Sequence, residues 1–353
     1  MTAIPEELQV TYEQLADLEK DFEDVETEII RQQVQMTRDL YAKREKLIAQ
    51  IPVFWSLVFE QAPPDIDEFI QPTDSNVLLT SLKSLSVSRF EIEGEGEGEG
   101  GSKGGDPRSV AIRFEFEDND YFEDKVLEKK FWYRRDEDGW AGLVSEPVEI
   151  KWCQGKDLTE GLLGMAKKVW DQQQAAAAKN GAASGADKDK KKKPRTEKDF
   201  TPEEKALKEK LDGTGIGGMS FFAWFGYCGP RITAEESRIA TEKERENRRL
   251  RAEGKKVEPK DEDEEEEEDE DEDDDEVTEE ELEIFPEGDS LAIAISEDLW
   301  PSALKYFTQA QEDDMMSDVD FESDEEGMDI ASNDASENEE GDEDAPAPKK
   351  RKA

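Results

Sequence analysis

The stretch Thr11–Ile51, TYEQLADLEKDFEDVETEIIRQQVQMTRDLYAKREKLIAQI, decides the fold of this chain. Apolar residues recur in it at alternating steps of three and four, which is the pattern of a heptad repeat on a helix. After Gln32 the register slips once, as coiled coils tolerate, and then continues. The repeating positions, called the heptad stripe below, are Leu15, Leu18, Phe22, Val25, Ile29, Met36, Leu40 and Leu47.

Both ends of this helix are marked in the sequence. Thr11 can cap it with Gln14 three residues on, and Pro52 ends it because the residue before a proline avoids the helical region. At ~1.5 Å per residue the helix is roughly 60 Å long. One small domain cannot cover such a rod. We therefore favour a homodimer formed through residues 1–51 over a core helix with one solvent-exposed edge.

Charge is unevenly distributed over the rest of the chain. The 353 residues include 94 acidic and 46 basic ones, a formal net charge of -48, and no histidine. Asp261–Glu283 holds 20 acidic residues and no basic one, and Thr308–Ala353 holds 17 acidic and 4 basic ones. Such runs bury too little apolar surface to fold, so we expect a disordered acidic insertion (229–286) and a disordered acidic tail (308–353). The favoured partners are polycations, whereas nucleic acids and anionic membranes are repelled.

Several classes of function are excluded. Without histidine there is no Ser-His or Cys-His pair, and no glycine-rich phosphate loop is present, so we expect no enzyme activity. Cys153 and Cys228 lack metal-site spacing and the acidic runs lack an EF-hand pattern, so we expect no metal and no cofactor. Met1–Val10 does not read as a signal peptide and no apolar run could span a membrane, which indicates an intracellular protein.

Residues 52–307 form the predicted folded domain, of class α+β. Alternating apolar residues predict an antiparallel sheet whose four strands lie near Val87–Ile92, Val110–Phe116, Glu128–Arg135 and Val148–Trp152. Short helices should cover one face of it: one after Pro52, one near Asp74–Leu82 and one after Asp157. The aromatic run Ser220–Phe225 is interpreted as core rather than as an exposed binding patch. A loop (93–108), a linker (172–200) and the insertion should be flexible, although residues 233–256 are helix-prone.

Five blocks of sequence occur in the order found in a known family. They are Ile51–Trp55 (IPVFW), Tyr121–Leu127 (YFEDKVL), Glu149–Thr159 (EIKWCQGKDLT), Ser220–Phe225 (SFFAWF) and Trp300–Phe307 (WPSALKYF). Through them the chain resembles the nucleosome assembly protein family, and within it the SET (template-activating factor I) branch of histone chaperones. Two features depart from that pattern: Asp120 stands where the family usually has proline, and the acidic insertion is larger than expected in that branch.

The resemblance implies a dimer through the long helix and an "earmuff" domain with a four-stranded antiparallel sheet covered by helices. It implies a nuclear histone chaperone that binds either or both core histone pairs, takes part in nucleosome assembly and chromatin remodelling, and can shuttle to the cytoplasm. We expect the folded part of the histone site at acidic residues beside the second strand: Glu115, Glu117, Asp118, Asp120, Glu123 and Asp124.

Two other functions stay open. One is a regulatory inhibitor that masks histones from a histone-modifying enzyme or phosphatase, or binds that enzyme directly. The other is a carrier of different basic proteins, such as ribosomal or linker-histone-like ones.

Two further kinds of short signal concern traffic and modification. Basic clusters flanked by polar sequence suit nuclear import: Lys190, Lys191, Lys192, Lys193 and Arg195, and Lys349, Lys350, Arg351 and Lys352. Ser317, Ser323 and Ser336 each lie near following acids, in a pattern that an acidophilic kinase accepts. Phosphorylation there would add negative charge.

Overall fold

The computed structural model describes residues 12–93, 105–181, 195–214, 219–253, 255, 276–277 and 279–326. The chain divides into two compact units, Met1–Ala310 and Gln311–Ala353. Every contact given below lies within the first unit. The flexible loop predicted at 93–108 and the acidic run of the insertion fall largely outside the described residues.

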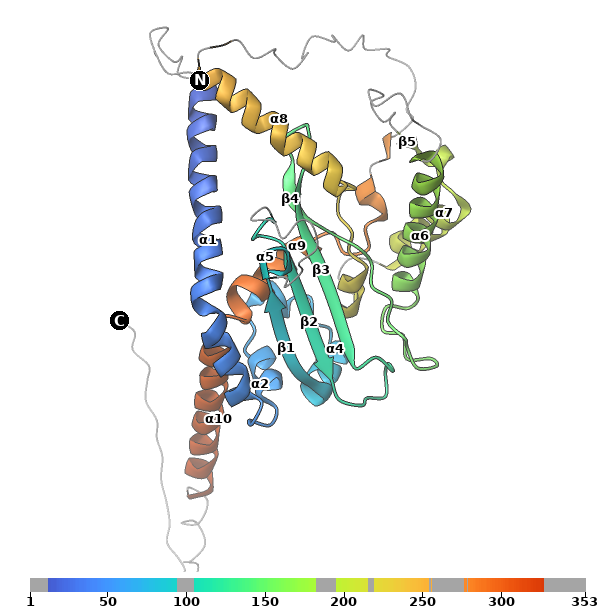
Figure 1. Ribbon diagram of the computed structural model, residues 1–353. Helices are drawn as coiled ribbons and strands as arrows, with labels where there is room; N and C mark the ends of the chain where they lie inside the picture. Colours follow the sequence, from blue (N-terminus) through green and yellow to red (C-terminus); the bar gives the residue numbers. More distant parts are fainter. Residues whose placement is uncertain are drawn as a thin grey trace, which may run out of the picture. The chain divides into compact units, whose positions relative to one another are not determined.

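Helix α1 (Tyr12–Ile48) confirms the long N-terminal helix (Figure 1). Its heptad stripe is unpartnered in the single chain, because every member is between 51 and 79% exposed. A second apolar face, which includes Ile30, Val34, Tyr41 and Ile48, contacts the domain instead. At 100° per residue, these two faces lie about 100° apart around the helix axis. The helix can therefore hold its own domain and still present the heptad stripe to solvent.

The four-stranded antiparallel sheet is confirmed, with strands in chain order. The strands are β1 (Leu82–Ser88), β2 (Val110–Phe116), β3 (Val126–Arg135) and β4 (Ala141–Ser145). The predicted positions of β2 and β3 are right, and those of the outer strands are wrong. Phe90–Glu93 forms the short helix α5.

The displaced fourth strand has a clear local cause. Asp136 Oδ1 accepts hydrogen bonds from the Gly139 and Trp140 amides, so a tight turn starts the pairing of β4 at once. Val148–Trp152 lies beyond β4, where the Val148 amide donates to the Phe225 carbonyl and Trp152 forms an isolated bridge with Phe122. The alternation in that segment marks burial, as at Ile150, but not a strand of this sheet.

The core lies on one face of the sheet. Ile112, Phe114, Leu127 and Phe131 pack there against the 3-10 helix η3 (Phe221–Gly226), in which every residue is buried. The centroid of the Trp224 ring lies 5.3 Å from that of Phe131, and its Nε1–H donates to the Gly288 carbonyl at 2.8 Å. The core interpretation of the aromatic run is therefore confirmed.

Short helices complete the domain. The remaining elements are α2 (Phe54–Glu60), α3 (Pro64–Asp67), α4 (Pro72–Ser81), α6 (Leu162–Gly181), η1 (Glu197–Asp199), α7 (Pro202–Thr214), η4 (Glu279–Leu282), α9 (Gly288–Ile293) and the π-helix η5 (Ala294–Leu299). A small second sheet pairs β5 (Arg195–Thr196) with β6 (Glu276–Val277). The predicted helix near Asp74 begins earlier, because Gln71 is its N-cap and Asp74 closes the capping box from the third helical position.

Two segments predicted to lack regular structure are partly helical, and the helix-prone segment within the predicted insertion forms a helix as expected. Helix α8 (Ala234–Ala252) lies inside the predicted insertion and begins at a capping box formed by Thr233 and Glu236. Helix α10 (Ala303–Glu326) continues past Thr308, where the acidic tail was predicted to begin. Helix α6 runs to Gly181 through the alanines at the start of the predicted linker. In each case good helix formers continue the helix, and no proline or glycine interrupts α10 before Gly327.

Helix α8 links α1 to the end of the sheet. Arg248 Nη2 lies 2.7 Å from Asp24 and Arg251 Nη2 lies 2.7 Å from Asp17, both on α1. At its other end, Ser237 Oγ accepts a hydrogen bond from the Arg135 amide on β3. The inserted helix therefore fastens the N-terminal half of α1 to the domain (Figure 1).

Reversing these charges should loosen α8. We expect Arg248→Glu with Arg251→Glu to speed amide exchange in α8 by about tenfold, because partly exposed ion pairs contribute up to ~1 kcal/mol each. Adding Asp17→Arg and Asp24→Arg should restore slow exchange by swapping the charges. Hydrogen exchange measured by mass spectrometry checks both variants. Equal exchange in the wild type and the first variant would contradict the fastening role.

Candidate functional site

The predicted acidic residues gather where β2 passes into β3. Glu115 lies on β2, and the other five follow between Phe116 and Val126. Asn119 organises the turn, because its Oδ1 accepts hydrogen bonds from the amides of Tyr121 (2.9 Å) and Phe122 (3.1 Å). The Phe122 side chain is thereby buried in the core, while Asp118, Asp120 and Glu123 remain at the surface.

Basic neighbours neutralise part of this acidic surface. Four of the six carboxylates have a cation close by; the pairs are Glu115 with Arg113 (2.7 Å), Glu117 with Lys83 (3.7 Å), Asp118 with Lys125 (2.9 Å) and Asp124 with Lys151 (3.6 Å). The hydrogen bond from Lys125 to Asp118 raises the pKa of that lysine. Lys83 and Lys151 could not be paired from sequence because they come from other segments, whereas Arg113 and Lys125 lie close to their partners in sequence.

The six candidates therefore differ in what they offer a partner. Asp124 is mostly covered and accepts a hydrogen bond from the Lys151 amide at 2.7 Å, so it holds the turn together. Asp120 and Glu123 are exposed or nearly so, and no ion pair within the described residues involves them. The Asp118 side chain is 90% exposed despite its lysine. We define the acidic turn as Asp118, Asp120 and Glu123.

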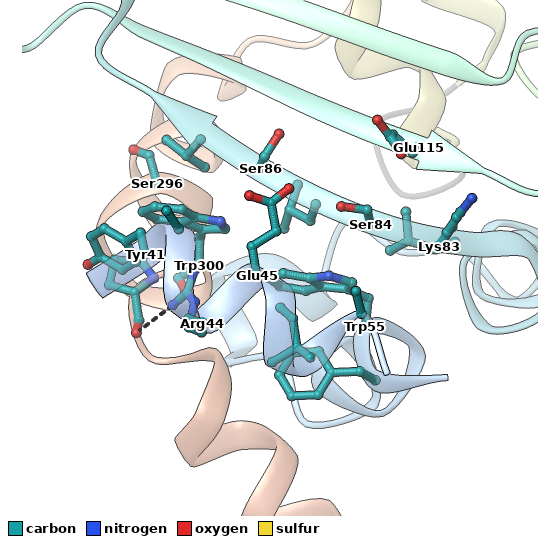
Figure 2. A pocket seen from close by; sticks show the side chains of 18 of the residues that line it. Tyr41, Arg44, Glu45, Trp55, Lys83, Ser84, Ser86, Glu115, Ser296 and Trp300 are labelled. Atoms are coloured by element: carbon teal, nitrogen blue, oxygen red, sulfur yellow. Dashed lines mark hydrogen bonds between the residues drawn. The ribbon is translucent and has the colours of Figure 1, made fainter. Parts of the chain in front are cut away.

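A groove lies between α1 and β1, next to this surface (Figure 2). Its volume is about 940 Å³, and it is lined by the C-terminal half of α1, most of β1, and part of η5. Glu115 and Glu117 of the predicted site line it, together with Glu45 of α1, which sequence reasoning missed. The position of Glu45, between Tyr41 and Ile48 of the domain-facing side of α1, was a usable signal.

Aromatic stacking fixes the wall of this groove. The Arg44 guanidinium lies 4.6 Å from the Tyr41 ring centroid and 4.5 Å from that of Trp300, and its Nη1 donates to the Trp300 carbonyl at 2.7 Å. Figure 2 shows Arg44 beside both rings, with the hydrogen bond dashed. Burial lowers the pKa of Arg44. The Trp300-Pro301 motif therefore anchors α1 to the domain.

A buried polar cluster lies on the core face of the sheet, at β3. The Lys129 Nζ is fully buried and donates to three carbonyls, those of Glu146 (2.9 Å), Phe225 (3.0 Å) and Tyr227 (2.8 Å). Burial lowers the pKa of Lys129 to about 7. Glu283 accepts hydrogen bonds from the Cys228 and Gly229 amides, and burial raises its pKa.

This cluster joins segments that are distant in sequence. The lysine stands at an inward position of β3, between Leu127 and Phe131, which breaks the apolar alternation. Glu283 follows the long acidic run and Cys228 precedes it, so their hydrogen bond closes the insertion at its base. The cluster is structural, since it touches neither the acidic turn nor the groove.

The remaining predicted sites are only partly described. Lys190–Lys193, Lys349–Lys352 and Ser336 lie outside the described residues. Arg195 is placed as backbone in β5, opposite Val277 at the end of the acidic run. Ser317 and Ser323 are positions of helix α10. Among the described residues, no group of three or more histidine, cysteine, aspartate or glutamate side chains could hold a metal ion, and no helix could cross a membrane.

Comparisons with known proteins identify the family of this chain. The family model for the nucleosome assembly protein (NAP) family matches residues 4–310. A protein of Schizosaccharomyces pombe named as a nucleosome assembly protein is 31% identical over 160 residues, which cover 42% of this chain and 59% of that protein. Protein SET of Drosophila melanogaster is 33% identical over 133 residues, covering 36% of this chain and 43% of the relative.

Solved structures are similar over most of the chain. The crystal structure of the Vps75 histone chaperone covers 84% of this chain and 97% of its own, with 21% identity and a TM-score of 0.45. That of Ccp1 covers 85% and 95%, with 24% identity and a TM-score of 0.44. The chain spans less than two thirds of the length of the curated relatives named above. Because the family model matches most of the sequence, this chain belongs to the nucleosome assembly protein family.

Proposed function

We propose that this protein is a histone chaperone that binds core histones through acidic surfaces and serves nucleosome assembly. The observation that carries the proposal is the acidic turn, where exposed carboxylates stand at the end of a rigid sheet in a chain of net charge -48. Histones are dense in lysine and arginine, and they aggregate when nothing screens that charge. Membership of the nucleosome assembly protein family also supports the proposal.

Shielding is the mechanism that this geometry supports. Carboxylates replace the phosphate field of DNA without its regular spacing, so the histone stays soluble and can be released to DNA. At physiological salt the Debye length is ~8 Å, so only carboxylates close to the histone count. Binding should therefore weaken as salt rises. The ordered acidic turn would add selectivity that a mobile polyanion lacks.

We propose further that the protein acts as a homodimer in the nucleus. The exposed heptad stripe supports the dimer, since eight large apolar side chains in a row are costly to leave in water. The two basic clusters would serve import, and shuttling to the cytoplasm would follow if export also occurs. Phosphorylation of Ser317, Ser323 or Ser336 would strengthen the acidic field; intact mass after native purification tests it.

A histone-modifying enzyme or phosphatase is a second proposed partner. In that role the protein would inhibit by masking histones or by binding the enzyme itself. The two modes separate experimentally, because inhibition of an enzyme acting on a histone-free substrate persists only in the second. The acidic tail would contribute negative charge in both modes.

Neutralising the acidic turn should weaken histone binding. We expect Asp118→Asn with Asp120→Asn and Glu123→Gln to raise the Kd for a core histone pair by about tenfold, since each lost contact with a cation costs roughly 0.5 kcal/mol. The matched control is Asp65→Asn with Asp67→Asn and Glu68→Gln, which removes the same charge from exposed positions around α3. Fluorescence titration of labelled histones measures both.

The control decides the outcome. A change of less than twofold in the α3 variant, beside the tenfold change in the turn variant, would support a site at the acidic turn. Equal changes in the two variants would mean that only net charge matters, and the folded site would be lost from the proposal.

A further inference from the structure

Strand β1 has an unused hydrogen-bonding edge. In an antiparallel pair, successive residues direct their N–H and C=O groups to opposite sides of the strand. The Phe116 amide donates to the Lys125 carbonyl at 2.9 Å, toward β3, and the Glu117 amide donates to the Ser81 carbonyl at 2.8 Å, toward β1. Odd-numbered residues of β2 therefore pair with β1.

The register then shows which groups of β1 remain. Opposite the odd residues of β2 stand Ser84, Ser86 and Ser88. Leu85 and Val87 lie between these serines, so their N–H and C=O groups point away from β2. β1 is the first strand of the sheet, and within the described residues no strand or other backbone group bonds to this edge. Leu85 is only 2% exposed, so the accessible part of this edge is at Val87, which is partly exposed.

The groove between α1 and β1 lies along this edge. Leu85 and Val87 both line it, and Val87 is partly exposed at the end nearer Arg89. Figure 2 shows the Glu45 carboxylate reaching from α1 toward Ser84 and Ser86. An extended peptide is the ligand that such an edge recognises, because it supplies the missing donors and acceptors in register.

Charge in the groove selects the kind of peptide. Its four cations are engaged: Lys83 lies 3.7 Å from Glu117 and Arg89 lies 3.4 Å from Glu297. Arg44 is stacked and hydrogen-bonded to carbonyls, and Arg38 also has a partner. Glu45 is exposed, and no ion pair within the described residues involves it. Its carboxylate attracts the neighbouring Arg44 but remains exposed beside the edge, where it suits a lysine or arginine side chain.

We infer that the groove binds an extended, lysine- or arginine-bearing peptide as an added strand on β1, pairing at Val87, with a basic side chain on Glu45. This inference rests on the proposed function, in that the peptide would be a terminal segment of the same basic partners. It adds a second, backbone-reading site to the acidic turn.

A synthetic peptide tests the strand pairing. The probe is a labelled 12-residue peptide of alternating lysine and threonine, and its match carries methyl groups on alternate backbone nitrogens. We expect the methylated peptide to bind the full-length protein about tenfold more weakly, because it keeps the charge but loses backbone donors. Equal affinity for the two peptides would overturn the inference in favour of charge attraction alone.

Two variants with matched controls locate the site. Val87→Pro removes the edge N–H and should weaken the unmethylated peptide about fivefold, whereas Val87→Ala keeps it and should bind like the wild type. Glu45→Gln should cost about tenfold, and Asp39→Asn, exposed on the opposite side of α1, less than twofold. Equal peptide affinity of the Val87→Pro and Val87→Ala variants would overturn the inference. So would a Val87→Pro variant whose self-association changes while its peptide affinity does not.

Hydrogen exchange on the wild-type protein gives an answer that needs no variant. The Val87 amide should become protected when the unmethylated peptide is added, and unchanged exchange there would overturn the inference. Binding of a core histone pair lacking its terminal tails, run in parallel, tests the proposed function separately. If that pair binds while Val87 stays unprotected, the chaperone proposal stands and the groove inference fails.

Discussion

Glutamate substitutions at Phe22 and Val25 should convert the protein from a dimer to a monomer. Both side chains are more than half exposed in the single chain and occupy the middle of the heptad stripe. In a two-fold symmetric pair each substitution occurs twice, so four carboxylates would lose water at an apolar surface. Unpaired buried charges cost about 3–5 kcal/mol each, so we expect the dimer Kd to rise by at least ~10⁴-fold.

Light scattering of the purified variant at several concentrations measures this effect. The control is Gln35→Glu, which adds a charge to an exposed position of α1 away from the heptad stripe and should leave the dimer intact. Contacts of α1 with its own domain use the other face, so the monomer should stay folded. A dimer that persists in the double variant would place the interface elsewhere.

Replacing Lys129 by methionine should destabilise the folded domain by about 2–4 kcal/mol. The ammonium satisfies three buried carbonyls, and a thioether satisfies none of them. Removing the desolvation cost of the lysine offsets only part of that loss. Chemical denaturation followed by tryptophan fluorescence measures the change, since Trp224 lies in the same core.

The pH dependence of this difference gives a sharper test. The pKa of Lys129 is about 7 in the folded protein and near 10.5 in the unfolded chain, so between these values the unfolded state binds one more proton. The free energy of unfolding of the wild type then gains on the order of 1 kcal/mol per pH unit from this group, and the Lys129→Met variant gains none of it. The deficit of the variant should widen from pH 7 to pH 9. A stability deficit of the variant that stays constant over this range would contradict the lowered pKa of Lys129.

Local patterns were sufficient to predict much of this fold. The heptad spacing predicts α1 almost to its last residue, and strict alternation predicts β2. The position of β3 is also predicted correctly, although Lys129 breaks its alternation. The aromatic run Phe221–Phe225 could be assigned to the core because so much apolar surface in one run is rarely left in water. Each of the helix and strands predicted in this way has one apolar face, and that face produces a regular spacing of apolar residues.

Features set by tertiary contacts could not be predicted in the same way. Val148–Trp152 alternates like a strand, yet its hydrogen bonds go to η3 and to the turn after β2. Helix α8 has almost no apolar stripe and is held by arginines that meet aspartates of α1 more than 200 positions away in the chain. No local sequence pattern in α1 or α8 predicts these ion pairs.

The acidic site shows the same division. Its residues could be predicted from their place beside the second strand, but their cations could not, because Lys83 and Lys151 come from segments distant in sequence. Glu45 lies on the second, domain-facing side of α1, which the heptad spacing does not predict. Which cation pairs with which carboxylate can therefore be read only from the folded structure.

The most direct test of the account is a titration of each labelled core histone pair with two forms of the protein, one of full length and one ending at Ala310, the last residue of the first unit. Runs at physiological and at severalfold higher salt complete it. If an ordered acidic surface binds histones, the shorter form should bind each histone pair more weakly and with a shallower salt dependence, because fewer charge contacts remain, yet keep measurable affinity at physiological salt. Complete loss of binding in the shorter form would contradict the account and leave a polyanionic tail as the only histone site.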